Sequence, residues 1–326
     1  MYFNVKLLFI LLFIWSTTVL SQKQDSIANS IQYITINNNL TYGYTKPKFR
    51  DIYRHIPKNL IDFGKFTIQK ENLKWDALIL GSTLAIIPYD QKILNDANQF
   101  GEKLGGWDKD SQYIKVGGFL RIIPKNIPSA VYYIGNGGTT LLLSGLFYGI
   151  GKIGKDDYRA LTTSNELVEV LLSVGIATQT IKRISGRQSP SVSTKDGGNW
   201  TPFPSINAFQ NKTPNYDAMP SGHLATYTAT IIVIATNYPE LKWIKPVGYT
   251  LGGIIAFNMV STKVHWTSDY PIAILIGYVM GKNIANKRII KQEKNNEIEV
   301  KKSSITTNFT FNRYNNMNIA GLTITF

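Results

Sequence analysis

The chain of 326 residues contains no cysteine and only three histidines. The absence of cysteine excludes disulfide bonds, thiolate catalysis and a lipid anchor attached through a lipoprotein cysteine. Histidine is the side chain that most readily gains and loses a proton near neutral pH, so a chain with few histidines has few places for such chemistry. The positions of these three residues are therefore informative.

Acidic residues are scarce relative to basic ones, with 21 Asp and Glu against 35 Lys and Arg and a formal net charge of +14. This excess of positive charge suits attraction to anionic lipid headgroups or to phosphorylated substrates. The basic residues are scattered towards both ends of the chain, and no recognisable nucleic-acid-binding module accompanies them. We therefore expect no nucleic-acid partner.

Two of the histidines lie in short polar motifs, Pro-Ser-Gly-His at 220–223 and His-Trp-Thr-Ser-Asp at 265–269. If the second motif is helical, Asp269 lies one turn after His265 and accepts its imidazole N–H. The other ring nitrogen is then free to attack phosphorus, while His223 protonates the leaving group and later deprotonates water. The pattern predicts phosphoryl transfer through a phospho-histidine, without a metal or other cofactor. The alternative role of Asp269 is to cap a helix that begins at Tyr270.

A binding site for the phosphate is predicted from the residues around these histidines. Ser221 and Gly222 follow the helix breaker Pro220 at an expected helix start, where a hydroxyl and backbone N–H groups face an anion. A third polar cluster at 182–190 closes an upstream apolar stretch, and its Lys182 supplies a cation. The alternative for Lys182 is a cation that complements the dipole at a helix C-terminus.

The three clusters, in this order, resemble the signature motifs of the type 2 phosphatidic acid phosphatase superfamily, which also includes bacterial acid phosphatases and vanadium haloperoxidases. Lys182 and Pro190 match the first motif, residues 220–223 the second, and His265 and Asp269 the third. The resemblance implies an all-α fold, a six-helix bundle, over about residues 75–290. It also implies that His265 is the nucleophile, that Asp269 orients it, and that His223 is the acid and base.

Two arginines of the family pattern are replaced. The arginine before Pro190 is Ser189, and the Ser-Arg pair of the third motif is Asn258-Met259. An arginine binds phosphate with two parallel hydrogen bonds, which serine and methionine do not form. We expect Arg187, two residues before Ser189, to hold the phosphate together with Lys182, Ser221 and Gly222. The alternatives for the replacement cation are Arg183 and Lys263, which are also near in the sequence pattern. A catalytically weakened phosphate-binding protein of the same fold is the alternative; a vanadate-dependent haloperoxidase is a weaker one, because vanadate without the arginines should bind poorly.

The rest of the chain divides by composition. Residues 1–21 have the pattern of a signal peptide cleaved before Gln22, which predicts export to a periplasm or cell envelope; an uncleaved anchor is the alternative. Residues 22–72 are polar and aperiodic, which predicts an extension of low order. Residues 73–290 are expected to form the helical domain, and 291–326 a basic tail whose end alternates like a hairpin.

Apolar helical stretches are expected at about 75–88, 128–153, 164–184, 222–237, 245–262 and 270–289. The uncharged run 128–151 is long enough to span a bilayer, although buried helices of a soluble bundle give similar runs. The resemblance favours membrane embedding, with a phosphorylated lipid or a small phosphate ester as partner. The long loop 188–219 carries four aromatic residues and is expected to be a lid or a substrate-binding element.

Overall fold

The computed structural model describes residues 31–105, 107, 113–116, 120–293, 306–314 and 317–325. The signal peptide expected at residues 1–21 lies outside the described residues. The chain divides into two compact units, and the described part of the first comprises Ile31, Gln32 and the described residues within 44–289. The second comprises residues 33–43 and the chain from Ile290. Helices dominate the described residues, which confirms the expected all-α fold.

The expected apolar stretches form helices close to their predicted bounds. These are α4 (Leu73–Ile86), α6 (Ile127–Gly135), α7 (Gly137–Ile153), α8 (Tyr158–Ser185), α10 (Gly222–Asn237), α11 (Ile244–Ser261) and α12 (Tyr270–Asn286). The expected stretch 128–153 is two helices rather than one, because Asn136 is extended and its side chain caps α7 through Gly138 N. The run 128–151 is therefore not one continuous helix, and the count of six helices is not confirmed.

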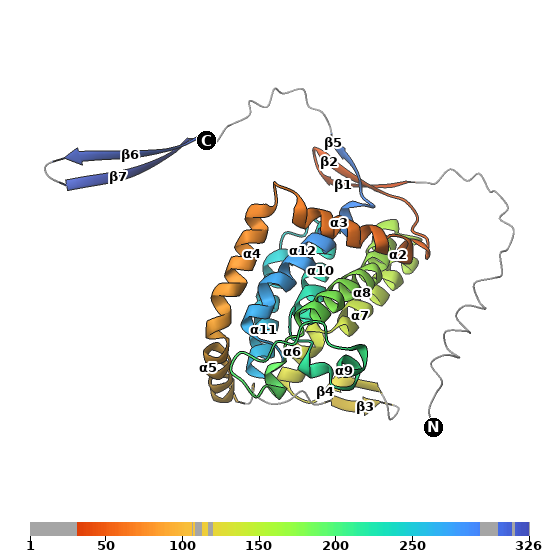
Figure 1. The fold of residues 1–326 in the computed structure, drawn as a ribbon. Coiled ribbons are helices and arrows are strands. Elements are labelled where there is room, and N and C mark those ends of the chain that lie inside the picture. Colours follow the sequence, from red (N-terminus) through yellow and green to blue (C-terminus); the bar gives the residue numbers. More distant parts are fainter. Residues whose placement is uncertain are drawn as a thin grey trace. The chain divides into compact units, whose positions relative to one another are not determined.

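The centre of the bundle is formed by α8, α10 and α12, with α7 and α11 beside them (Figure 1). Helices α10 and α12 approach closely because two glycines of α12 face α10. A Cβ atom on Gly277 would lie 2.4 Å from the carbonyl oxygen of Ala225, and one on Gly281 would lie 2.8 Å from that of Ala229. Aliphatic side chains fill the space between the three helices: Leu167, Val170, Val174, Val233, Ile276, Met280 and Ile284.

Residues before α4 are ordered and pack onto this bundle. Helices α2 (Asp51–Arg54) and α3 (Ile56–Ile68) contact α8, and the Asn59 amide of α3 donates to Glu169 Oε1 at 2.6 Å. Glu169 also accepts from Arg288. The prediction of low order for residues 22–72 is therefore wrong from residue 31 onward. Its cause is a long-range contact, since the partners of the buried Glu169 carboxylate come from distant segments that local periodicity does not reveal.

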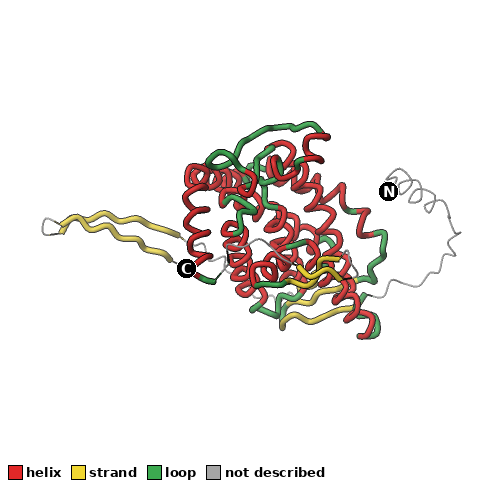
Figure 2. The backbone as a smooth tube through the Cα atoms, turned by 90° about the horizontal axis from the view of Figure 1, so that it is seen from below, coloured by secondary structure: helices red, strands yellow, loops and turns green. Residues whose placement is uncertain are grey.

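Shorter elements complete the first unit and connect the helices (Figure 2). After α4 come the 3₁₀ turn η1 (Ile87–Tyr89), α5 (Asp90–Lys103) and the hairpin of β3 (Tyr113–Val116) and β4 (Leu120–Pro124). The loop 186–221 contains η2 (Pro190–Val192), α9 (Ile206–Asn211) and η3 (Thr213–Asn215), and η4 (Thr267–Asp269) precedes α12. Figure 1 shows α5, α6, α9 and the β3–β4 hairpin at the same end of the bundle.

The second unit consists of strands. β1 (Gln32–Asn37), β2 (Leu40–Tyr44) and β5 (Ile290–Glu293) form a sheet in the order β1-β2-β5, with β2 and β5 antiparallel. β6 (Thr306–Tyr314) and β7 (Met317–Thr325) form an antiparallel hairpin in which Phe309 pairs with Leu322. This pairing confirms the hairpin expected from the alternating sequence of the tail.

Candidate active site

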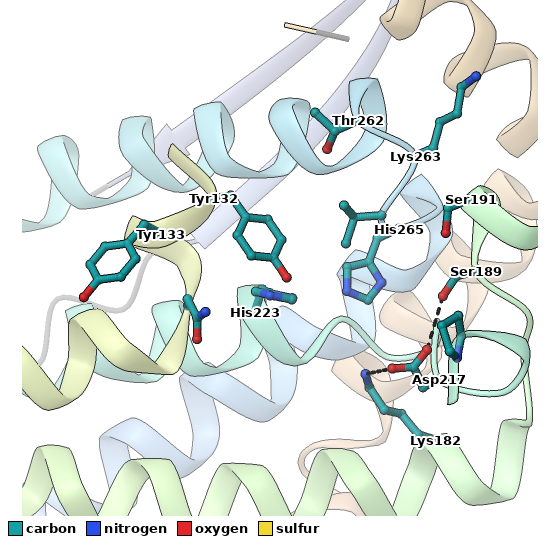
Figure 3. A pocket seen from close by; sticks show the side chains of 13 residues that line it. Tyr132, Tyr133, Lys182, Ser189, Ser191, Asp217, His223, Thr262, Lys263 and His265 are labelled. Carbon is teal, nitrogen blue, oxygen red and sulfur yellow. Dashed lines mark hydrogen bonds and ion pairs between the residues drawn. The ribbon is translucent and has the colours of Figure 1, made fainter. Parts of the chain in front are cut away.

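The three motifs meet at one cavity of about 580 Å³ in the first unit (Figure 3). Its walls come from α6, from the C-terminal turn of α8, from the loop 186–221, from the start of α10 and from the segment after α11. The loop expected to bind substrate thus does line the cavity. The lining residues are Tyr132, Tyr133, Asn136, Lys182, Ser189, Ser191, Pro214, Asp217, His223, Thr262, Lys263, Val264 and His265.

The two motif histidines face each other in this cavity, with ring centroids 5.7 Å apart and ring planes at 71°. His223 is the second residue of α10, and the ring of Tyr132 packs 4.8 Å from it. Burial, with smaller contributions from the nearby His265 and Lys182, lowers the pKa of His223 to about 3. His223 is therefore neutral at neutral pH.

His265 lies beside Asp269, as expected, but not on a shared helix. The backbone at Trp266 is extended, with ψ 152°, and only Thr267–Asp269 form a 3₁₀ turn, so the predicted helical spacing is wrong. The turn nevertheless brings Asp269 Oδ2 to 3.4 Å from His265 Nδ1. The same oxygen accepts the backbone N–H of Trp266 at 2.8 Å. No side-chain bond from Asp269 caps α12, so the capping alternative at Tyr270 is not observed.

Arg187 does not line the cavity, contrary to its predicted role as a phosphate ligand. Its side chain is 0% exposed, and its Nη1 donates to Ser268 Oγ at 2.6 Å and to Asp269 Oδ1 at 2.8 Å. Its Nη2 donates to Asp90 Oδ2 at 2.6 Å, and the carbonyl oxygen of Gly197 accepts from Nη2 and Nε at 2.9 and 3.3 Å. The guanidinium forms ion pairs with two buried carboxylates. Burial of those carboxylates without a countercharge would cost free energy.

Asp90, the first residue of α5, is a part of this cluster that sequence reasoning missed. Its carboxylate accepts from Arg187, from Ser268 N at 3.0 Å and from the Ser268 hydroxyl, and its side chain is fully buried. It thereby holds the turn that carries Asp269. In the sequence, Asp90 is indistinguishable from an ordinary acidic residue in the first turn of a helix.

Lys182, in the last turn of α8, does line the cavity, but it already has a partner there. Its ammonium lies 3.6 Å from Asp217 Oδ2, and the hydroxyl of Ser189 donates to Asp217 Oδ1 at 3.3 Å (Figure 3). Sequence reasoning missed Asp217, whose only local signal is its place in the loop just before residues 220–223. The carboxylate therefore lies next to the residue that replaces the first family arginine.

The segment 220–223 starts a helix as expected, but its residues do not all face the cavity. Ser221 is buried outside the cavity lining, where its Oγ accepts from Leu224 N at 3.3 Å and its N–H donates to Asp269 O at 3.2 Å. Its hydroxyl thus caps α10, and its backbone joins the second motif to the third. A Cβ atom on Gly222 would lie 3.9 Å from Lys182 Nζ, so the backbone at Gly222 adjoins this cation.

Neither position of the replaced arginines supplies a cation to the cavity. Met259 is 0% exposed in the core, with its sulfur 3.9 Å from Ser221 Oγ. Lys263 lines the cavity, and Figure 3 shows its ammonium directed away from the ring of His265. Among the residues that the structure describes, no group of three or more histidine, aspartate or glutamate side chains forms a candidate metal site.

Comparison with known proteins gives one finding. Residues 164–288 match the model of the PAP2 superfamily, a range that extends from α8 to just beyond α12 and includes Lys182, His223, His265 and Asp269. No curated protein and no solved structure matches the chain significantly.

Proposed function

The chain belongs to the PAP2 superfamily through residues 164–288, and we propose that it hydrolyses a phosphate monoester or pyrophosphate through a phospho-histidine. The superfamily consists mostly of phosphatases, which supports the general class of phosphoric ester hydrolases for this chain. The observation that carries the proposal is the pair of imidazole rings 5.7 Å apart, with Asp269 3.4 Å from Nδ1 of one ring. A phosphoryl group between two such rings has a nucleophile on one side and a proton donor on the other.

In the first step, Nε2 of His265 attacks phosphorus because Nδ1 faces Asp269. A nitrogen–phosphorus bond forms, the bond from phosphorus to the leaving oxygen breaks, and His223 gives that oxygen a proton. In the second step, water attacks phosphorus, its proton passes to His223, and the nitrogen–phosphorus bond breaks to release phosphate. His223 by itself is neutral at neutral pH, so it takes up its proton when the negative charge of the phosphoryl group enters.

The phosphoryl oxygens are held by Lys182 and by backbone N–H groups in the first turn of α10. The first N–H groups of a helix lack helical acceptors and carry partial positive charge, which suits an anion. Gly222 brings this backbone next to Lys182 Nζ. We propose that Ser221 contributes as the helix cap that sets the direction of these N–H groups rather than as a direct ligand.

We propose that the substrate is lipid-linked and that the protein works at a membrane. Apolar side chains are exposed in rows along α7, namely Leu141, Leu142, Leu146, Ile150 and Ile153. Exposed apolar rows of this kind suit lipid better than water. By length and composition, α8 is the one described helix apolar enough to cross a membrane, and 67% of its apolar window is buried inside the protein. The exposed rows therefore support this proposal more than α8 does.

We also propose that the mature chain is exported and begins at Gln22. The support is the signal-peptide pattern of residues 1–21 alone. N-terminal sequencing of protein recovered from the cell envelope tests the cleavage, and a sequence that begins at Met1 would contradict it.

The decisive experiment uses the full chain purified in detergent and presented with phosphatidic acid or an aryl phosphate in the presence of a chelator. We expect hydrolysis, and a phosphoprotein that is stable to alkali and labile to acid. His265→Ala should lower turnover at least about 10⁴-fold, because the nucleophile is lost. His55→Ala is the matched control, since His55 lies outside the cavity lining. Equal activity of His265→Ala and wild type would refute the mechanism.

A second candidate is a phosphate-binding protein with little turnover. Two observations favour it: Ser189 and Met259 stand where the family has arginines, and Lys182 is paired with Asp217. Tight binding of inorganic phosphate without hydrolysis of any ester would identify this function. None of the described cavity-lining residues is an arginine, so no observation favours a vanadate-dependent haloperoxidase.

A further inference from the structure

A carboxylate projects into the cavity where the proposed chemistry calls for positive charge. Asp217 is the one acidic residue among the described residues that line the cavity. Its two oxygens face two different partners, the ammonium of Lys182 at 3.6 Å and the hydroxyl of Ser189 at 3.3 Å. Figure 3 shows the carboxylate between these side chains, on the same side of the cavity as the ring of His265.

The position of Asp217 is fixed by its backbone as well as by its side chain. Asp217 forms an isolated β-bridge with Arg187, and the adjacent Ala218 N–H donates to the Arg187 carbonyl oxygen at 2.9 Å. Because the side chain of Arg187 is itself anchored in the buried cluster, the loop at 217 is tied to a rigid part of the protein. A phosphoryl group that enters the cavity therefore meets a carboxylate that is held in place.

The other charged or titratable groups that face this carboxylate do not offset it fully. Lys182 shares its charge with Asp217, and the ammonium of Lys263 points away from His265. His223 is neutral at neutral pH, and Nδ1 of His265 lies 3.4 Å from a second carboxylate, that of Asp269. A doubly charged phosphoryl group would thus be repelled by Asp217 while competing with it for Lys182. A singly charged phosphoryl group keeps one P–O–H, which is a hydrogen-bond donor that suits a carboxylate acceptor.

We propose that Asp217 is a specificity-determining residue that makes the cavity selective for the monoanionic form of a phosphoryl group. The P–O–H donates to Asp217, and the remaining oxygens are bound by Lys182 and the first turn of α10. This inference rests on the proposed function, because it assigns the ionic form of the substrate to that same site. It accounts for the loss of arginine at 189, since a monoanion needs fewer cations than a dianion.

Binding of two inorganic anions tests the proposal without any turnover. Sulfate is a dianion across the accessible pH range, whereas phosphate becomes a monoanion below its second ionisation, as phosphate esters do below about pH 6. The full chain is titrated with each anion by calorimetry at about pH 5.5 and about pH 8.5. Protein groups that titrate affect both anions, so the ratio of the two dissociation constants isolates the ionic form of phosphate.

For wild type we expect phosphate to bind at least about tenfold more tightly than sulfate at the lower pH, the scale of one charged hydrogen bond, and the preference to vanish at the higher pH. Asp217→Asn removes the charge at nearly constant shape, and should bind sulfate about tenfold more tightly than wild type does, with little preference left. Asp62→Asn on α3 makes the same change of net charge far from the lining residues, and should keep the wild-type ratio.

Three results would overturn the proposal: equal affinity of wild type for the two anions at the lower pH, an unchanged ratio in Asp217→Asn, or no binding of either anion by any of the proteins. A wild type that binds neither anion at the lower pH would also overturn the proposal, even if Asp217→Asn gained sulfate binding, because monoanionic phosphate is the form that the wild-type cavity is proposed to bind. Hydrolysis is measured separately on the same samples. Monoanion selectivity without turnover would therefore contradict the proposed enzyme and leave the role of Asp217 intact.

Discussion

Two neighbouring regions use the same motifs differently: the cavity, and the buried cluster of Asp90, Arg187, Ser268 and Asp269 behind it. In the cluster, each nitrogen of the Arg187 guanidinium has an acceptor within 3.3 Å, and Arg187, Asp90 and Asp269 are 0% exposed. In the cavity, the Lys182 ammonium lies 3.6 Å from the carboxylate of Asp217, and the His265 and His223 rings line the wall. A cation with all donors occupied holds structure, whereas one that is partly paired is available to a ligand.

One glycine lies along the chain between Lys182, which lines the cavity, and Arg187, which lies in the buried cluster. Lys182 and Arg187 belong to the same motif, but Gly186 ends α8 between them with a φ of +55°. A Cβ atom at Gly186 would lie 1.7 Å from the carbonyl oxygen of Thr201, so only glycine allows this turn. The turn leaves Lys182 on the cavity side and directs Arg187 into the cluster.

The sharpest way to break the comparison is to alter the residue that the two regions share. Asp269→Asn keeps the size of the side chain but removes the charge that faces both His265 and Arg187. We expect turnover to fall about 10²- to 10⁴-fold with little change in KM, because orientation of the imidazole is lost and substrate contacts are not. Steady-state kinetics measure this split, with Asp96→Asn on the exposed face of α5 as control. An unchanged kcat would show that Asp269 has a structural role only.

Removing the cation of the cluster should affect stability more than binding. Arg187→Met leaves Asp90 and Asp269 buried without their countercharge, so we expect the free energy of unfolding to fall by about 3–5 kcal/mol. Arg183→Met, which loses only the stacking of Arg183 on Phe209, should cost at most about 1 kcal/mol. Chemical unfolding of both variants measures the difference. Equal stabilities would show that the cluster does not stabilise the fold as its geometry indicates.

The last prediction concerns the pH dependence of stability that arises from His223. Its pKa is about 3 in the folded protein and 6.5 ordinarily, so the unfolded chain binds a proton between these values that the folded chain does not. The contribution of neutral, buried His223 to the free energy of unfolding is fully present above about pH 6.5 and is lost as pH falls towards 3. His223→Gln should therefore flatten the fall in Tm across this window, as followed by thermal unfolding. The same slope in both proteins would rule out His223 as its source.

Local patterns predict much of this molecule, and the parts that they miss depend on distant contacts. The start of α10 follows from Pro220 and Ser221, and the end of α8 follows from Gly186, because caps and breakers act within a few residues. The closeness of Asp269 to His265 was predicted, but on the basis of a helix that is absent. Arg187 was predicted to bind phosphate because it lies two residues before Ser189, in the same motif as the missing arginine.

The residues missed by sequence reasoning share one property. Asp90 and Asp217 are acidic residues whose partners come from other segments of the chain, and nothing near them in sequence marks those partners. The order of residues 31–72 was missed for the same reason, since Asn59 matters only once Glu169 lies beside it. A buried charged side chain is stabilised by partners that are close to it in space, and a single sequence does not show which residues those are.

The glycines between α10 and α12 help to set the distance between the His223 and His265 rings. His223 stands at the start of α10, and the turn with His265 and Asp269 leads directly into α12, so the spacing of the two helices sets the gap between the rings. Gly277 permits that spacing, because a Cβ atom there would lie 2.4 Å from the carbonyl oxygen of Ala225, two residues beyond His223. A methyl group added there would push the two helices apart near the start of α10. The lack of a side chain at Gly277 thus helps to set the distance between the His223 and His265 rings.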